Sequence, residues 1–329
     1  PVPTKPAPYA RQTLTEADIS TIAENRGELL AKFRAAKTGL FQPFGKFPVI
    51  LFPGFDGGGE WGGPAVDPDG TLYVNSQNMA WYVTMSDTPK ESELSQMSLG
   101  QRRYTENCIA CHGIERKGLP AGGIPSLVDV RARLTREQVF ATITSGRKMM
   151  PAFTLLHKED KDAIIGYLFG DAQKGGSGTS ATADLPPRIP YRFNGYDRWI
   201  DSKGYPAISP PWGELSAIDL NTGEYKWKVR LGEFKALTAR GIPPTGTENY
   251  GGPVSTAGGL LFIAATKDGM FRAFDKRSGA VLWQYTLPAA GFATPSTYMA
   301  GGKQYVVVAC GGTKLETAPG DSYVAFALP

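Results

Sequence analysis

The sequence AIDLNTGEYKW at residues 217–227 recurs as AFDKRSGAVLW at residues 273–283, and residues 65–70 form a shorter, degenerate copy. Each copy is typical of a strand, a turn and a second strand. The aspartate caps the turn, the glycine allows a positive φ, and the tryptophan can pack flat against a neighbouring unit. Repeats of this size in an all-β context are typical of four-stranded propeller blades. We therefore predict a mainly β fold in which Trp227 and Trp283 are structural rather than catalytic.

Length and composition allow two domains and exclude two functional classes. The chain has 329 residues, and its 40 glycines and 26 prolines indicate many turns rather than long helices. No apolar run approaches the length that crosses a bilayer, so we expect no membrane span. A net charge of +4 is too small to indicate a nucleic-acid partner. The chain shows no signal peptide and opens on proline, so we expect a processed chain or a piece of a longer one.

The motif Cys108-Ile109-Ala110-Cys111-His112 predicts covalent attachment of a c-type haem. Each thiol can add across one vinyl group of the porphyrin, and His112 then reaches the iron. A structural zinc site would need a second Cys or His pair, which the sequence lacks. A thioredoxin-like pair would lie near a βαβ pattern, and a plain disulfide would leave His112 unexplained.

The second axial ligand of the iron is predicted in the stretch Arg147–Phe153. Thioether sulfur opposite imidazole raises the reduction potential of an electron-transfer haem. Met150 directly precedes a proline, a pattern that resembles class I cytochromes c, and it is preferred over Met149. Packing in the core is the usual role of methionine. Ligation by His157, at the start of a predicted helix, is the minor alternative.

The order of segments predicts four parts: propeller blades with a helical insertion at 1–88, a cytochrome c domain at 89–172, a linker at 173–190 and C-terminal blades at 191–329. The spacing of Thr13 and Glu16 favours a helix that runs to about Lys37, and an Asp-Gly turn at 69–70 favours a hairpin. Helical stretches from Leu99 and over 160–169 resemble the first and last helices of a class I cytochrome c. Cys310 reads as a buried free thiol.

Cationic residues surround the haem motif. They are predicted to form either a solvated face or a docking rim for an acidic electron acceptor. They are Arg102, Arg103, Arg116, Lys117, Arg147 and Lys148.

Taken together, these residues resemble the pyrroloquinoline quinone (PQQ)-dependent dehydrogenases, most closely those of the quinoprotein glucose dehydrogenase type, with an inserted class I cytochrome c domain. The resemblance covers most of residues 1–85 and 190–329. It is carried by residues 52–54, 60–63, 210–219, 251–257, 293–298 and 302–308. It implies part of an eight-bladed propeller, about three to four blades, because a propeller closes only with a full ring.

The same resemblance implies PQQ and Ca²⁺ as cofactors beside haem c. It places the catalytic base and calcium ligands in a missing N-terminal propeller half, so that no catalytic residue is expected in this chain. Glu60, Trp61 and Asp56 are the candidate quinone contacts that remain. The neighbouring glycines could let the backbone approach a flat ligand or only turn a corner between blades. Glu60 could instead form a salt bridge that closes a loop.

The function that follows is the C-terminal part of a periplasmic quinohaemoprotein dehydrogenase. A sugar or alcohol would be oxidised through PQQ, and haem c would pass electrons to an external acceptor such as a soluble cytochrome. The alternative is a non-enzymatic electron-transfer cytochrome carried on a propeller scaffold. A haem sensor would need an open axial position on the iron. Met150 is predicted to fill that position, which argues against a sensor.

Overall fold

The computed structural model describes residues 4–118, 124–147, 150–171 and 190–328. It divides into two compact units: a sheet unit, residues 1–42, 50–81 and 198–329, and a helical unit, residues 43–49 and 82–197. No helix among the described residues is long and apolar enough to cross a membrane. The predicted linker at 173–190 lies almost entirely outside the described residues.

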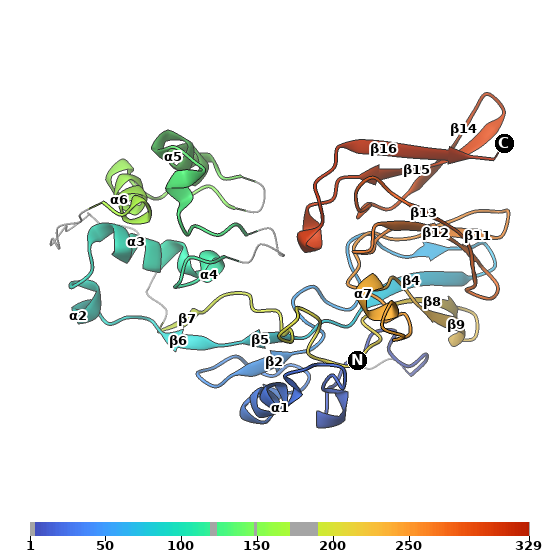
Figure 1. The fold of residues 1–329 in the computed structure, drawn as a ribbon, viewed down its shortest axis with the longest axis horizontal. Helices are drawn as coiled ribbons and strands as arrows, with labels where there is room; N and C mark the ends of the chain where they lie inside the picture. The colour runs from blue at the N-terminus through green and yellow to red at the C-terminus, as the bar shows by residue number, and fades with distance from the viewer. Residues whose placement is uncertain (1–3, 119–123, 148–149, 172–189, 329) are drawn as a thin grey trace. The chain divides into compact units, whose positions relative to one another are not determined.

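Three antiparallel sheets build most of the sheet unit and stack in order along the chain (Figure 1). The first sheet has the strand order β3 (Ala65–Val66), β4 (Thr71–Gln77), β8 (Gly213–Asp219) and β9 (Glu224–Arg230). The second has the order β10 (Val254–Ser255), β11 (Leu260–Ile263), β12 (Met270–Asp275) and β13 (Val281–Thr286). The third has only β14 (Ser296–Ala300), β15 (Lys303–Cys310) and β16 (Ser322–Ala327). The mainly β, partial-propeller fold is thereby confirmed.

The helical unit is inserted between two paired strands of one sheet. Strands β4 and β8 pair along their whole length, from Thr71 opposite Asp219 to Gln77 opposite Gly213. The repeat copies at 65–70 and 217–227 therefore share the first sheet instead of starting separate ones. The chain leaves this unit at Trp81 and returns at Arg198, and these two residues form an antiparallel bridge.

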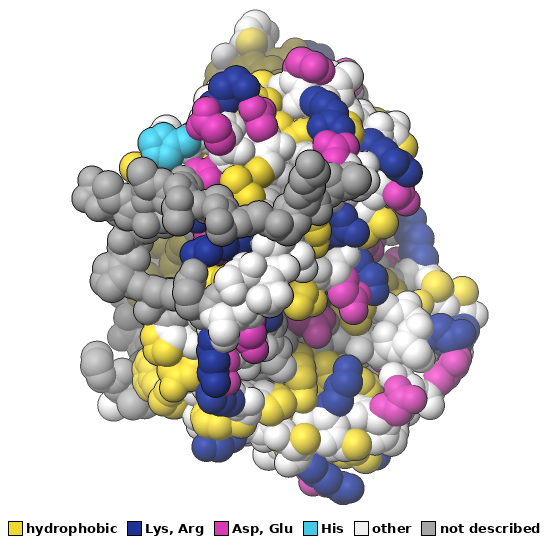
Figure 2. Space-filling model, turned by 90° about the vertical axis from the view of Figure 1, so that its left-hand side faces the viewer, with side chains coloured by type: hydrophobic (Ala, Val, Ile, Leu, Met, Phe, Trp, Pro, Cys, Tyr) yellow, Lys and Arg dark blue, Asp and Glu magenta, His cyan; other side chains and the backbone are white. Residues whose placement is uncertain are grey.

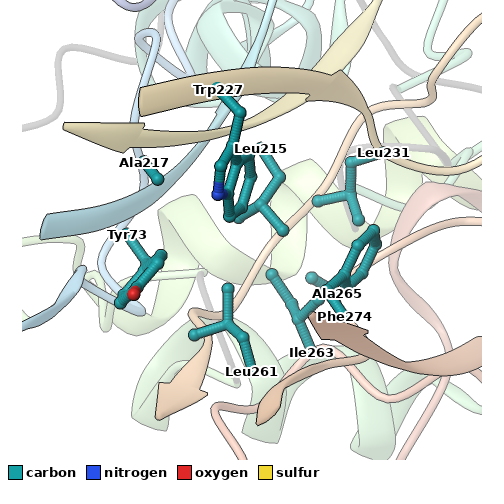
Figure 3. Close-up of a cluster of buried hydrophobic side chains, with 9 residues drawn as sticks. All are labelled: Tyr73, Leu215, Ala217, Trp227, Leu231, Leu261, Ile263, Ala265 and Phe274. Carbon is teal, nitrogen blue, oxygen red and sulfur yellow. The ribbon is translucent and has the colours of Figure 1, made fainter. Parts of the chain in front are cut away.

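The repeated tryptophan and glycine hold the first two sheets together (Figure 3). The Trp227 ring is 9% exposed, and its Nε1 donates a hydrogen bond of 2.8 Å to the carbonyl of Lys276. Gly279 has φ +72°, and a Cβ there would lie 2.8 Å from the Trp227 ring. One copy of the repeat thus supplies the ring and the next supplies the glycine that accepts it. Buried neighbours on both sheets complete the cluster: Tyr73, Leu215, Ala217, Leu231, Leu261, Ile263, Ala265 and Phe274.

The N-terminal helix prediction is wrong in extent. A short 3₁₀ turn η1 (Glu16–Asp18) and a helix α1 (Arg26–Ala35) replace one helix from Thr13 to Lys37. The capping contacts belong to Thr15 and Asp18 rather than Thr13 and Glu16. Ile19 interrupts the helix because its backbone pairs with Ile208 of the same unit. A tertiary β-bridge therefore overrides the local helical preference.

Helices dominate the unit that carries the haem motif. They are α2 (Glu91–Leu94), α3 (Leu99–Asn107), α4 (Ile109–His112), α5 (Arg136–Ser145) and α6 (Lys158–Phe169), with a 3₁₀ turn η3 (Val130–Ala132). Strands β6 (Met85–Asp87) and β7 (Tyr191–Phe193) pair beside them. Helices α3 and α6 pack together, as predicted, through the tilted rings of Tyr104 and Tyr167 and a buried Arg103–Asp160 ion pair of 2.7 Å.

The remaining elements are short. Strands β1 (Lys37–Thr38), β2 (Val49–Leu51) and β5 (Trp81–Val83) lie near the unit boundary, and α7 (Lys235–Thr238) and η4 (Lys314–Glu316) lie in loops of the sheet unit. Cys310 is fully buried and free, as predicted.

The two repeat tryptophans give a matched test of this packing. In the 329-residue chain, Trp227→Ala should lower the free energy of unfolding by about 3–5 kcal/mol, because it empties a buried site. Trp283→Ala removes the equivalent side chain, which is 38% exposed, and should cost about 1 kcal/mol. Denaturant unfolding followed by circular dichroism measures both, and equal losses would contradict this account.

Candidate functional site

The two motif cysteines lie on one side of a helical turn. Cys108 ends α3 and starts α4, and its carbonyl accepts a 2.9 Å hydrogen bond from the His112 amide. The Cys108 side chain is half-buried and that of Cys111 is exposed, and both thiols are free. Spacings of three and four residues place Cys108, Cys111 and His112 on the same helical face. The structure therefore contains no disulfide bond between Cys108 and Cys111.

The His112 imidazole is buried and already oriented. It is 6% exposed, and its Nδ1 lies 3.1 Å from the carbonyl of Pro125. Since a carbonyl can only accept, Nδ1 carries the proton and Nε2 keeps its lone pair. Burial also lowers the pKa of His112, which favours the neutral ring. A neutral imidazole with a free Nε2, held by a carbonyl, is the form that binds a metal.

Met150 lies against the same hydrophobic cluster as Cys108. A tight bridge fixes its backbone, because Arg147 and Met150 exchange two backbone hydrogen bonds of 3.0 Å. Gly146, with φ +73°, is required there, since a Cβ would lie 2.7 Å from the Met150 carbonyl oxygen. Met149 lies outside the described residues. Met150 as the axial ligand therefore stays a prediction, and His157 is an exposed N-cap of α6.

The helical unit fits a covalently bound haem. It offers two free thiols and one neutral imidazole, and Cys108 packs against a core cluster of nine buried side chains. These are Tyr104, Ile109, Val130, Val139, Ile143, Leu156, Ile164, Ile165 and Leu168. Within the described ranges, no group of three or more His, Cys, Asp or Glu residues could hold a metal ion, so the zinc alternative finds no ligand set.

The cationic rim predicted around the haem motif is largely paired with acids. Arg103 is 4% exposed and lies in the interior, where it forms ion pairs with Asp160 and Glu106. The prediction that it lies on a surface rim is therefore wrong. Arg102 also pairs with Glu106, at 3.2 Å.

Other members of the rim are likewise engaged. Lys117 pairs with Glu115, and the Arg116 guanidinium lies 5.3 Å from the centre of the Tyr167 ring. Figure 2 shows cationic and anionic side chains interleaved on the face that it draws. Lys148 lies outside the described residues.

In the sheet unit, Glu60 occupies a half-buried polar site. Its Oε1 accepts a 2.9 Å hydrogen bond from Gln77 Nε2, which lies on β4. Burial, and then the nearby charge of Asp56, raise the pKa of Glu60 to about 7, against an opposing effect of Lys314. The pKa of Glu60 therefore lies near neutral pH, and the Gln77 amide is a described partner of its carboxyl group. The adjacent Trp61 side chain is 67% exposed.

The glycines beside Glu60 serve backbone packing. A Cβ on Gly62 would lie 2.2 Å from the Gly251 carbonyl carbon, and one on Gly252 would lie 2.2 Å from the Gly63 carbonyl oxygen. Two glycine pairs from distant segments thus bring their backbones into contact. The close approach seen here joins two backbone segments, and the approach to a flat ligand stays a prediction.

Asp56 belongs to a buried network that the sequence did not reveal. It accepts a 2.9 Å hydrogen bond from Tyr250 Oη and lies 3.5 Å from Arg198, which also forms an ion pair with Glu248. Burial and the charge of Asp56 raise the pKa of Tyr250, so its hydroxyl keeps its proton and donates it. Lys314 Nζ lies 3.6 Å from the centre of the Tyr250 ring. The sequence contains one indication of this network, because Tyr250 directly precedes the motif at residues 251–257.

As quinone contacts, Glu60, Trp61 and Asp56 stay a prediction. Trp61 offers an open aromatic face, Glu60 a titratable carboxyl and Lys314 a cation. The described residues supply no cluster that could hold Ca²⁺.

Comparison with known proteins identifies the family. Residues 1–119 and 142–306 match the family model of the PQQ glucose/ethanol/alcohol dehydrogenase β-propeller domain, and the chain belongs to this family. Residues 95–168 match the model of cbb3-type cytochrome c oxidase subunit III. The predicted PQQ-type propeller with a cytochrome c domain is thereby confirmed.

Individual relatives agree with this assignment. Quinoprotein glucose dehydrogenase of Escherichia coli K12 is 42% identical over 169 residues, which are 47% of this chain and 20% of that protein. The glycerol dehydrogenase large subunit of Gluconobacter oxydans 621H is 29% identical over 91% of this chain and 32% of its own length. The chain thus spans a fifth to a third of these relatives.

A solved quinohaemoprotein alcohol dehydrogenase from Comamonas testosteroni aligns over 85% of this chain and 27% of its own. The sequence identity is 18% and the TM-score 0.40, too low for a comparison of site geometry.

The haem assignment predicts two spectroscopic results. Acid acetone should leave the red colour on the protein, because thioether bonds survive denaturation. Met150→Ala should abolish the weak sulfur-to-iron band near the red edge of the oxidised spectrum. If Met149→Ala abolishes that band instead, the ligand is the neighbouring residue.

The raised pKa of Glu60 predicts a pH-dependent stability. Its pKa is higher in the folded chain than the ordinary 4.5, so the contribution is complete below about pH 4.5 and is lost as the pH rises to about 7. Glu60→Gln should remove about 1–2 kcal/mol of this pH dependence, allowing for partial exposure. Urea unfolding at pH 4.5 and 7.5 measures it. Glu224→Gln, at a 63% exposed side chain, is the control and should leave the difference unchanged.

Proposed function

We propose that this chain is the C-terminal part of a periplasmic quinohaemoprotein dehydrogenase. It would oxidise a sugar or alcohol through PQQ and pass the electrons through haem c to an external acceptor such as a soluble cytochrome. The observation that carries the proposal is the insertion of a unit with a Cys-x-x-Cys-His motif between paired strands β4 and β8 of a PQQ-type propeller sheet. The helical unit, which carries the haem motif, is therefore tethered at both ends to the propeller, and this keeps its effective concentration near the propeller high.

When bound, PQQ supplies two-electron oxidation and haem c one-electron transfer, while the protein supplies binding and orientation. Cys108 and Cys111 would anchor the haem, and His112 would offer Nε2 to the iron. The carbonyl of Pro125 keeps that ring in the required tautomer. Met150 would complete the axial pair.

In the sheet unit, Glu60 is suited to hold or release a proton at Oε1 or Oε2 near neutral pH. Gln77 fixes its orientation through the amide hydrogen bond. Trp61 would present its exposed face to the flat cofactor. Asp56, held by Tyr250 and Arg198, would polarise a cofactor oxygen from a fixed position.

The rest of the active site is proposed to lie outside this chain. The chain covers 20% of the glucose dehydrogenase and 32% of the glycerol dehydrogenase subunit. A catalytic base and the Ca²⁺ ligands would then belong to the missing N-terminal half of the propeller. Relatives named for glucose, quinate or shikimate, and glycerol support a hydroxylated substrate. The periplasm is proposed because covalent haem attachment takes place outside the bacterial cytoplasm.

A purified 329-residue chain tests the proposal. It should carry haem c but oxidise no aldose or alcohol when PQQ and Ca²⁺ are added, because the base lies elsewhere. The protein that contains the remainder should reduce its own haem on addition of substrate, which the haem absorbance follows. A variant with Cys108→Ala and Cys111→Ala is the control and should lose that signal. Substrate oxidation by the 329-residue chain alone would contradict the proposal that the catalytic base lies outside this chain. Absence of haem reduction in the whole protein would favour a non-enzymatic cytochrome carried on a propeller scaffold.

A further inference from the structure

The loop that follows the haem motif folds back onto His112. The Gly118 amide donates a 2.9 Å hydrogen bond to the His112 carbonyl. Within this loop, the Arg116 carbonyl accepts a 2.7 Å hydrogen bond from the Leu127 amide. Pro125, whose carbonyl orients the imidazole, lies two residues before Leu127. The backbone of Arg116 is therefore fixed beside the segment that orients the predicted iron ligand.

Arg116 holds a backbone conformation that its residue type disfavours. Its φ is +60°, in the left-handed region that glycine, asparagine and aspartate adopt more readily. Such a conformation persists only where the surrounding contacts impose it, and it is common at functional sites. A long cationic side chain is thus held at a position where a smaller residue would suit the backbone better.

The Arg116 side chain lies on an aromatic pair of the helical unit. Its guanidinium is 5.3 Å from the centre of the Tyr167 ring, within the range of a cation–π contact. The Tyr167 ring packs on the Tyr104 ring, with centroids 5.4 Å apart, and helices α6 and α3, which carry the two rings, lie side by side (Figure 1). Tyr104 is 1% exposed, and its carbonyl accepts a 2.8 Å hydrogen bond from the Cys108 amide. Two rings therefore connect the guanidinium to the turn that carries the haem motif.

No ion pair cancels the positive charge of Arg116 within the part of the chain that the structure describes. The neighbouring carboxylate, Glu115, pairs with Lys117 instead. The charge also acts on the interior of the unit. Burial has the largest effect on the pKa of Tyr104 and raises it, whereas the charge of Arg116 acts in the opposite direction. Arg116 therefore places a net positive charge at the edge of the haem-motif core.

Arg136 provides a contrast in the same unit. Its guanidinium also lies on an aromatic ring, 4.8 Å from the centre of Phe169. It forms a 2.6 Å ion pair with Asp171, and both side chains are about half exposed. The charge of Arg136 is thus neutralised locally and screened by water.

We propose that Arg116 raises the reduction potential of haem c, as a fixed and partly buried cation seated on Tyr167. Reduction removes one positive charge from the haem iron, so a nearby cation favours the reduced state. The inference rests on the proposed function, which places haem c in this unit. It assigns Arg116 to the electrostatics of the haem instead of to a docking rim. A higher potential favours electron transfer to the haem from the dehydrogenase site.

A redox titration of the haem absorbance in the haem-loaded protein tests the inference. Arg116→Asn removes the charge and suits the left-handed backbone. It should make reduction about threefold less favourable, which lowers the midpoint potential by about 28 mV for one electron. Arg116→Lys keeps the charge and should restore about half or more of the potential.

Arg136→Gln is the matched control, because it removes one positive charge from the other arginine–aromatic contact. It should produce about a third or less of the shift, since that charge is already paired and screened. The oxidised absorption spectrum should be the same in all variants, which separates a charge effect from a change of axial ligand.

Three results would overturn the inference and leave the proposed function standing. They are an unchanged potential in Arg116→Asn, an equal shift in Arg116→Lys or Arg136→Gln, and a shift that accompanies an altered spectrum. The first shows no influence on the haem, the second shows an effect of shape or of total charge, and the third shows a structural role. A protein without covalent haem would contradict the proposed function, and this inference with it.

Discussion

The pairing of β4 with β8 is the constraint on which the rest of the molecule depends. Seven residue pairs join two strands that are separated in sequence by the whole helical unit. This ladder makes the first sheet four-stranded, and the sheet in turn presents Trp227 to the second sheet. Without it, the ends of the helical unit would not return to neighbouring strands at Trp81 and Arg198.

The buried Arg198 network follows from the same junction. Arg198 is the first residue of the returning chain, and its guanidinium lies 5.4 Å from the ring of Trp81, the last residue of the departing chain. Its charge is neutralised by Glu248 and Asp56, which a buried cation requires. The loop that holds Asp56 also holds Glu60 and Trp61. The point where the chain leaves the sheet is thus electrostatically connected to the candidate cofactor loop.

The helical unit and the sheet unit position their candidate cofactor-binding residues in different ways. In the helical unit, local spacing places the two thiols and the imidazole together within a single turn, and burial sets the protonation state of His112. In the sheet unit, residues far apart in the chain meet: Asp56, Arg198 and the pair Glu248 and Tyr250 come from three separate segments. The first kind of site is visible in a motif and the second is not.

The sequence by itself determined the features that depend on local spacing. These are the haem motif, the strand-turn-strand repeat with its tryptophan and glycine, and the helical character of residues 99–169, since each is set by neighbours within a few residues. Tertiary structure alone decided that two repeat copies share one sheet, that Ile19 interrupts the expected N-terminal helix by pairing with Ile208, and that Arg103 is interior. It also raised the pKa of Glu60, because burial and the charge of Asp56 come from the fold around it. Such properties arise from contacts between distant segments, and periodicity and motif spacing carry no information about which segments meet.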